Sequence, residues 1–140
     1  MTALTPAGVR PPQFSEQEWQ ARVQLAACYR IFDRLGWTDA PGDSLTTLRL
    51  RGALVDALGR FDHPPTIERA RRAYADGTAA ASTVAGVLNT VGRHADAAAY
   101  ASWLAARRTA SGQEERWRLE HALALVRDPK LAQRTLDLTL

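Results

Sequence analysis

The stretch LRGALVDALGRFDHPPTIERARRAY, residues 50–74, decides the fold class. Its first half repeats apolar residues at the spacing that places them on one face of an α-helix. They are Leu50, Leu54, Ala57, Leu58 and Phe61. Pro64 and Pro65 then end this helix, because proline lacks an N–H and disfavours helical geometry in the residue before it. The stretch predicts two helices joined by a tight turn, with Asp62 or Thr66 as N-cap of the second.

The same unit recurs along the chain. LGRFDHPPTIERA (residues 58–70), VGRHADAAAYASW (91–103) and LVRDPKLAQRTLD (125–137) each contain the end of a helix, an arginine, an aspartate and a new amphipathic run. Asp62, Asp96 and Asp128 are 34 and 32 residues apart, a spacing close to that of helical solenoid repeats. The sequence therefore predicts about three repeats, each a pair of short helices.

The remaining segments divide into a tail, a leading helix and the repeat region. Residues 1–13 hold Pro6, Gly8, Pro11 and Pro12 and predict a flexible tail. Ser15 and Glu18 form a capping-box pattern at the start of a leading helix over 14–36. Its expected buried face comprises Trp19, Val23, Ala26, Ala27, Cys28, Ile31 and Phe32.

Within residues 44–140 further helices are expected at 44–61, 65–75, 78–92, 94–109, 113–127 and from 129 onward. Ser111 and Glu114 resemble a second capping box, and Asp128-Pro129 is typical of a helix start. Trp117, Leu119, Ala122, Leu123 and Val126 are expected inside. The last helix carries Leu131, Ala132, Leu136 and Leu140, which look unpartnered and make self-association plausible.

Composition favours one soluble helical domain of 140 residues. The net charge of +3 is mild, and nearly all the positive charge is arginine. Arg69, Arg71, Arg72, Arg107, Arg108, Arg116 and Arg118 could form a basic strip for nucleic acid or acidic peptides. Glu68–Arg72 and Glu114–Arg118 at i, i+4 would neutralise part of it, so we favour solvated helix faces. The single cysteine, Cys28, and the absence of a signal-peptide pattern predict a cytoplasmic protein without a membrane span.

The residues offer no recognisable catalytic, cofactor or metal site. His63 and His94 occupy corresponding turns, and His121 lies one turn from Trp117, where stacking is expected. No H-E-x-x-H, Gly-rich phosphate loop, G-x-S-x-G or Cys-Cys spacing occurs. The carboxylates Asp33, Asp56, Glu68 and Asp137 lie among arginines, which favours pairing or solvation. We therefore predict no catalytic residue, no cofactor and no metal.

From about Arg34 to Leu140 the chain resembles the C-terminal helical domain of aminopeptidase N-type zinc aminopeptidases, including the endoplasmic-reticulum and puromycin-sensitive enzymes. The matching stretches are LGW and PGDS within Leu35–Ser44, LRLRGALVDALGRF, IERARRAY and LEHALALVRDPKLAQRTLDL. In that family the zinc chemistry belongs to an upstream domain with G-A-M-E-N and H-E-x-x-H, which this chain lacks. The resemblance implies a HEAT- or armadillo-like helical bowl that covers a catalytic domain and bounds the peptide chamber.

Residues 15–39, SEQEWQARVQLAACYRIFDRLGWTD, resemble instead the first helix of class II aldolase and adducin head proteins. The N-H-x-S segment and zinc-binding histidines of that family do not follow. The two resemblances meet at Leu35–Trp37, so we interpret the chain as a composite, whether natural or artificial.

These observations predict an all-α fold: about seven helices in antiparallel hairpins forming a short HEAT/armadillo-like solenoid, without a sheet. We expect a non-catalytic domain that covers or binds peptide or a partner domain. The alternatives are an aldolase/adducin-related fragment without its active site, which a central sheet would distinguish, and a basic scaffold for nucleic acid or acidic peptides.

Overall fold

The computed structural model describes residues 9–140 and contains seven α-helices there, with no strand in that range. They are α1 (Glu16–Leu35), α2 (Leu45–Arg60), α3 (Pro64–Asp76), α4 (Val84–Arg93), α5 (Ala97–Thr109), α6 (Gln113–Ala124) and α7 (Pro129–Asp137). The predicted all-α fold is confirmed. Most of the predicted tail, residues 1–8, lies outside the described range, and residues 9–13 have irregular backbone.

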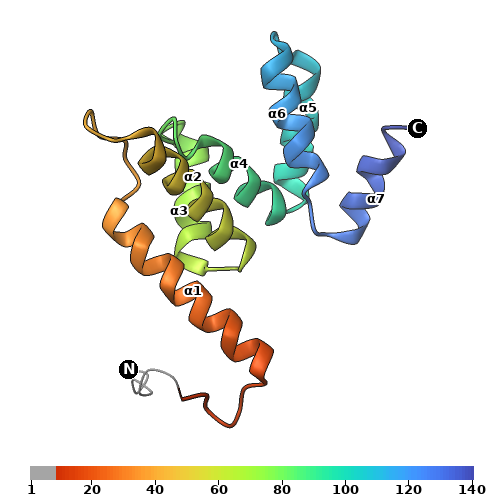
Figure 1. Ribbon diagram of the computed structural model, residues 1–140. Helices are drawn as coiled ribbons and strands as arrows, with labels where there is room; N and C mark the ends of the chain where they lie inside the picture. The colour runs from red at the N-terminus through yellow and green to blue at the C-terminus, as the bar shows by residue number, and fades with distance from the viewer. Residues whose placement is uncertain (1–8) are drawn as a thin grey trace.

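The predicted repeats correspond in chain order to α2–α3, α4–α5 and α6–α7, but α5 packs against α6 and has little contact with α4. Figure 1 shows α4 lying between a group formed by α1, α2 and α3 and the upright pair α5 and α6. The N-terminal half of α1 projects away from this body (Figure 1). None of the helices in residues 9–140 is long and apolar enough to cross a membrane.

Helix starts follow the local sequence rules at most points. Ser15 and Glu18 form the predicted reciprocal capping box, and Asp128 accepts hydrogen bonds from the N–H groups of Lys130 and Leu131. Two predicted caps are wrong. The N-cap of α3 is His63, because Asp62 takes a left-handed conformation with φ 59° in the turn. The N-cap of α6 is Gly112, and Ser111 makes no capping bond to it.

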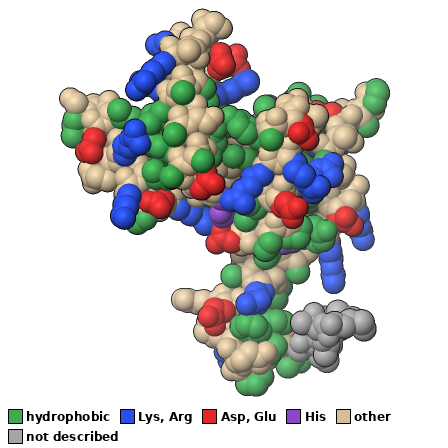
Figure 2. Space-filling model, turned by 180° about the vertical axis from the view of Figure 1, so that it is seen from behind, with side chains coloured by type: hydrophobic (Ala, Val, Ile, Leu, Met, Phe, Trp, Pro, Cys, Tyr) green, Lys and Arg blue, Asp and Glu red, His purple; other side chains and the backbone are tan. Residues whose placement is uncertain are grey.

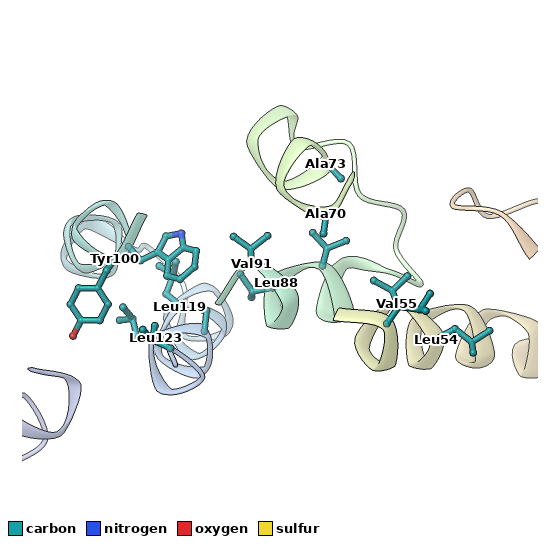
Figure 3. Close-up of a cluster of buried hydrophobic side chains, with 14 of the residues drawn as sticks. Leu54, Val55, Ala70, Ala73, Leu88, Val91, Tyr100, Leu119 and Leu123 are labelled. Atoms are coloured by element: carbon teal, nitrogen blue, oxygen red, sulfur yellow. The ribbon is translucent and has the colours of Figure 1, made fainter. Parts of the chain in front are cut away.

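The hydrophobic core runs from end to end along α4. Figure 3 shows Leu88 and Val91 of α4 between Val55 and Ala70 on one side and Leu119, Leu123 and Tyr100 on the other. Val55, Leu58, Ala70 and Tyr100 are completely buried. The helix pairs therefore share one continuous core.

Glycine precedes arginine at Gly59-Arg60 and again at Gly92-Arg93, and both glycines have a packing role. A Cβ atom at Gly59 of α2 would lie 2.0 Å from Thr90 Oγ1 of α4, and one at Gly92 of α4 would lie 2.8 Å from the Ala122 carbonyl oxygen of α6. Gly59 thus lets α2 touch α4, and Gly92 lets α4 touch α6. The predicted repeat corresponds to a repeated close helix contact.

The three predicted turns also meet in space. His94 Nε2 donates to the Gly59 carbonyl oxygen at 3.0 Å, since a carbonyl can only accept. Arg127 binds the Asp62 carboxylate and donates to the Arg60 carbonyl oxygen at 2.9 Å. His94 therefore joins the second turn to the first, and Arg127 with Asp62 joins the third turn to the first, whereas Asp96 and Asp128 cap their own helices.

The buried face of α2 differs from the predicted one. It comprises Arg51, Leu54, Val55, Leu58 and Gly59, whereas Leu50 and Phe61 are exposed. Arg51 is only 2% exposed. Its guanidinium binds Asp39 at 2.8 Å and Asp43 at 2.9 Å, and donates to the carbonyl oxygens of Leu35 and Gly36 at the end of α1. Arg51 therefore joins α1, the connector and α2.

The start of α4 is also later than the predicted Thr78. Residues 78–83 form a loop because the Ser82 N–H and hydroxyl both donate to the Asp39 carboxylate instead of continuing a helix. These bonds, and then Arg51, hold the pKa of Asp39 below its ordinary value. The Ala40 N–H, and then Arg51, do the same for the pKa of Asp43.

The predicted wide buried face of α1 is wrong as well. Phe32 is its only buried residue, and Leu25, Cys28 and Leu35 pack partly against the core. Val23, Ala26, Ala27 and Ile31 are exposed. The described part of the chain provides only one neighbouring layer for α1, so its second apolar face has no partner there.

The Gly59 contact gives a stability prediction. Gly59→Ala should lower the free energy of unfolding by about 1–2 kcal/mol, because overpacking against Thr90 outweighs the higher helix propensity of alanine. Thr90 Oγ1 is buried without a hydrogen-bond partner among the described residues, so adding Thr90→Ala should recover most of the loss. Urea denaturation measures both. Gly42→Ala, with open space around its Cβ, is the control, and equal stability of all variants would contradict the contact.

The Arg51 cluster gives a second prediction. Arg51→Met should destabilise the fold by about 3 kcal/mol, because two carboxylates and the carbonyls at the end of α1 lose their shared donor. Arg49→Met, on the exposed face of the same helix, should change stability by less than about 0.5 kcal/mol. Thermal or urea unfolding measures the difference. A loss for Arg51→Met no larger than that of the control would refute the role of Arg51.

Candidate functional site

A mostly apolar concave feature of the described residues lies between α4 and α6. These helices touch where Gly92 meets Ala122 and diverge towards their N-terminal ends, as Figure 1 shows. Two cavities of about 290 and 330 Å³ occupy the space between them. Val84, Leu88 and Arg118 line both cavities, so we treat them as one groove and call it the α4–α6 groove.

The floor of the groove is apolar and rigidly held. Val84 and Leu88 project from α4, and Ala73 and Ala79 extend the floor towards α3. On its opposite face α4 is pressed against α2, because a Cβ at Gly86 would lie only 2.9 Å from the Gly52 carbonyl oxygen. The floor therefore offers a fixed surface for apolar side chains.

An aromatic residue stands on each side of the floor. Tyr74 of α3 packs edge-on against the buried Trp103, with ring centroids 6.0 Å apart. Burial raises the pKa of the Tyr74 phenol, which keeps it neutral and able to donate a hydrogen bond. Trp117 of α6 is 61% exposed and stacks on His121 at 5.2 Å. Tyrosine and tryptophan with exposed edges are common anchors for partners.

The rim carries charges of both signs. Glu114, Glu115 and Arg118 lie along the α6 side, and Arg118 binds Glu114 at 2.5 Å. Both side chains of this pair are largely exposed, so the bond contributes little to stability. Arg118 can therefore exchange Glu114 for another carboxylate at low cost. The groove combines an apolar floor with a polar rim, an arrangement suited to an extended peptide.

The structure does not bring the predicted basic strip together. Arg71 donates to the His94 carbonyl oxygen, Arg107 binds Glu120 at 2.8 Å, and Arg69 lies over the Trp37 ring. Glu114–Arg118 forms as predicted, but within residues 9–140 Glu68 and Arg72 form no ion pair. Basic and acidic side chains are interspersed over the face in Figure 2. The seven arginines are divided among α3, α5 and α6, and four of them have local partners.

The histidines and carboxylates flagged in the sequence lie at separate places. His63 Nδ1 is 2.8 Å from Thr66 Oγ1, and its ring packs on Tyr29. Asp56 binds Arg60 and Arg93. Across residues 9–140 no group of three His, Cys, Asp or Glu side chains could hold a metal ion. The absence of catalytic and metal residues stays a prediction.

The prediction that Trp117 lies in the core is wrong. Trp117 precedes Leu119 by two residues, which places it about 200° around the helix from the face of Leu119, Ala122 and Leu123. Those three residues are buried. The helical period could thus have identified Trp117 as a residue outside the core. Tyr74 gave no comparable signal, since its place in the groove depends on how α3 packs on α4.

A comparison with models of protein families finds a match to the ERAP1-like C-terminal domain over residues 10–140. The match begins at residue 10, well before Arg34, the predicted start of the resemblance to the aminopeptidase domain. It includes residues 15–39, which resembled an aldolase/adducin helix. One family therefore covers both segments, and the interpretation of the chain as a composite is corrected.

Burial of His63 gives a pH prediction. Burial lowers the pKa of His63 below its ordinary value near 6.5, so below that pH the unfolded chain binds more protons than the folded one. The free energy of unfolding should therefore fall as the pH drops from 7.5 to 5.5. His63→Asn, which cannot titrate, should flatten this slope relative to the natural chain. Urea denaturation at several pH values measures it, and identical slopes would show that His63 does not contribute.

Proposed function

The chain belongs to the ERAP1-like C-terminal domain family, and from this we propose that it is a non-catalytic helical domain that binds peptide through the α4–α6 groove. The observation that carries the proposal is the apolar floor of Val84 and Leu88 between Tyr74 and Trp117. A peptide would place apolar side chains on this floor. Its backbone would remain near the polar rim, where water and side chains can satisfy it.

The free energies of apolar burial and of peptide ordering favour a modest affinity. Burying one apolar side chain contributes roughly 1.5–3 kcal/mol, and the groove has room for one or two. Ordering a flexible peptide offsets much of this gain. We therefore expect dissociation constants on the order of 100 µM for the domain alone.

We further propose that the domain acts beside a catalytic aminopeptidase domain, which would hold peptides near the groove and raise their effective concentration. The family assignment supports this partner, because the family is named after part of an aminopeptidase. A cytoplasmic location, expected from the single cysteine, belongs to the same proposal.

Peptide binding can be tested by calorimetry with peptides of about ten residues that carry leucine or phenylalanine, compared with the same peptides in which these residues are replaced by serine. Trp117→Ala should weaken binding about five- to thirtyfold, because it removes one wall of the groove. Since Trp117 is exposed, the fold should stay intact. Leu45→Ala, an exposed apolar residue on α2, should leave binding unchanged. Equal affinity of the Trp117→Ala variant and the natural chain would place binding elsewhere.

An activity assay on the same purified protein is the companion control. Aminoacyl-naphthylamide substrates with added zinc should show no turnover above buffer for the natural chain. Saturable, zinc-dependent turnover that is lost with a chelator would contradict the non-catalytic part of the proposal while leaving peptide binding to be judged by calorimetry.

A further inference from the structure

Helix α1 carries two apolar faces. The first, with Leu25, Cys28 and Phe32, faces the core. The second consists of Trp19, Val23, Ala27 and Ile31, which recur every fourth residue on the other side of the helix. We call this second set the outer stripe. Val23 is 45% and Ile31 47% exposed, Ala27 is exposed, and Trp19 is half-buried beside Phe14.

The outer stripe lies on the part of the chain that projects from the body. Figure 1 shows the N-terminal half of α1 standing clear of the other helices, and Figure 2 shows hydrophobic side chains gathered on this projection. An exposed row of large apolar side chains, standing clear of the body, is typical of an interaction surface.

Charges beside the outer stripe are arranged with opposite signs at its two ends. Glu16 lies on the same side of α1 at the N-terminal end, and Arg30 and Arg34 lie there at the C-terminal end. Among residues 9–140, Glu16 pairs with Arg10 and accepts a hydrogen bond from Gln20, in exposed contacts of 3.3 Å each. The residues of the stripe and its flanking charges are also spaced symmetrically about residue 25. The symmetric pairs are Val23 and Ala27, Trp19 and Ile31, and Glu16 and Arg34.

We propose that the outer stripe of α1 docks on the same stripe of a second copy of this chain, with the two helices antiparallel about a two-fold axis. In this arrangement Glu16 of each copy faces Arg34 of the other, and Gln20 faces Arg30. Trp19 packs near Ile31, and the smaller Val23 and Ala27 at the centre let the helices approach closely. A two-fold contact uses the same surface on both copies, which a self-complementary stripe satisfies.

The charges select the second copy and its direction. A parallel pairing would set Glu16 against Glu16 and Arg34 against Arg34, whereas the antiparallel pairing sets opposite charges together and also aligns opposite helix dipoles. The exposed apolar residues at the end of the chain, Leu136 of α7 and Leu138 at its C-cap, flank Asp137 and lack such an order. The contact of one helix pair is near or below the lower end of the roughly 1,200–2,000 Å² typical of stable interfaces. We expect a weak dimer, half assembled on the order of 100 µM.

Analytical ultracentrifugation of the full chain between 5 and 500 µM tests this dimer. The natural chain should approach twice its monomer mass at the highest concentrations. Val23→Asp should remain monomeric throughout, because it places two carboxylates at the centre of the contact. Leu136→Asp, at an even more exposed apolar residue on α7, should dimerise as the natural chain does. A natural chain that stays monomeric, or a dimer lost only with Leu136→Asp, would overturn the proposal and leave the outer stripe for a different partner.

Charge reversal gives a result that misfolding cannot imitate. Glu16→Arg and Arg34→Glu should each weaken dimerisation about fivefold, because each creates like charges across the contact. Combining both reversals restores opposite charges and should return the dissociation constant to near that of the natural chain. Circular dichroism of each variant checks that the helices persist. Additive weakening in the double variant would exclude the antiparallel arrangement.

Discussion

The buried guanidinium of Arg51 is the interaction on which the arrangement of the first half of the molecule depends. It binds Asp39 and Asp43 and the carbonyl groups that end α1. Asp39 in turn binds Ser82 in the loop before α4. One charged group thus fixes where α1 ends, where α2 lies and where α4 begins. A buried charge carries a large desolvation cost, so it persists only when its partners are all in place.

Helix α4 connects the part of the fold held by Arg51 to the α4–α6 groove. Glycines at the contacts of α4 with α2 and α6 let these helices approach closely. The contact at Gly92 is the position from which α4 and α6 diverge. The space left by this divergence is the α4–α6 groove. The apolar floor and the aromatic sides of the groove are positioned by the contacts of α4 with α2 and α6. The groove therefore has a defined shape although no sequence motif marks it.

Local sequence determined most helix positions, because apolar spacing, proline, glycine and capping residues act within a few neighbours. It could not determine which faces would be covered. Arg51 was not expected inside, the outer stripe of α1 was expected to be buried, and Trp117 was assigned to the core. In each case burial depends on the packing of distant segments. The connector carboxylates surround Arg51, residues 9–140 cover only one face of α1, and the divergence of α4 and α6 leaves Trp117 exposed. The groove could therefore be found only from the three-dimensional structure, whereas the absence of catalytic motifs is evident from the sequence.

We propose that the α4–α6 groove binds peptide and that the domain itself is non-catalytic. The most direct measurement is a titration of the ¹⁵N-labelled chain with an apolar-rich peptide, followed by NMR. Amide resonances of Ala85, Leu88 and Arg118, which line the groove, should shift in a saturable manner, while those of the outer face of α1 should not. Saturable shifts confined to other helices, or no shifts at millimolar peptide, would contradict the claim.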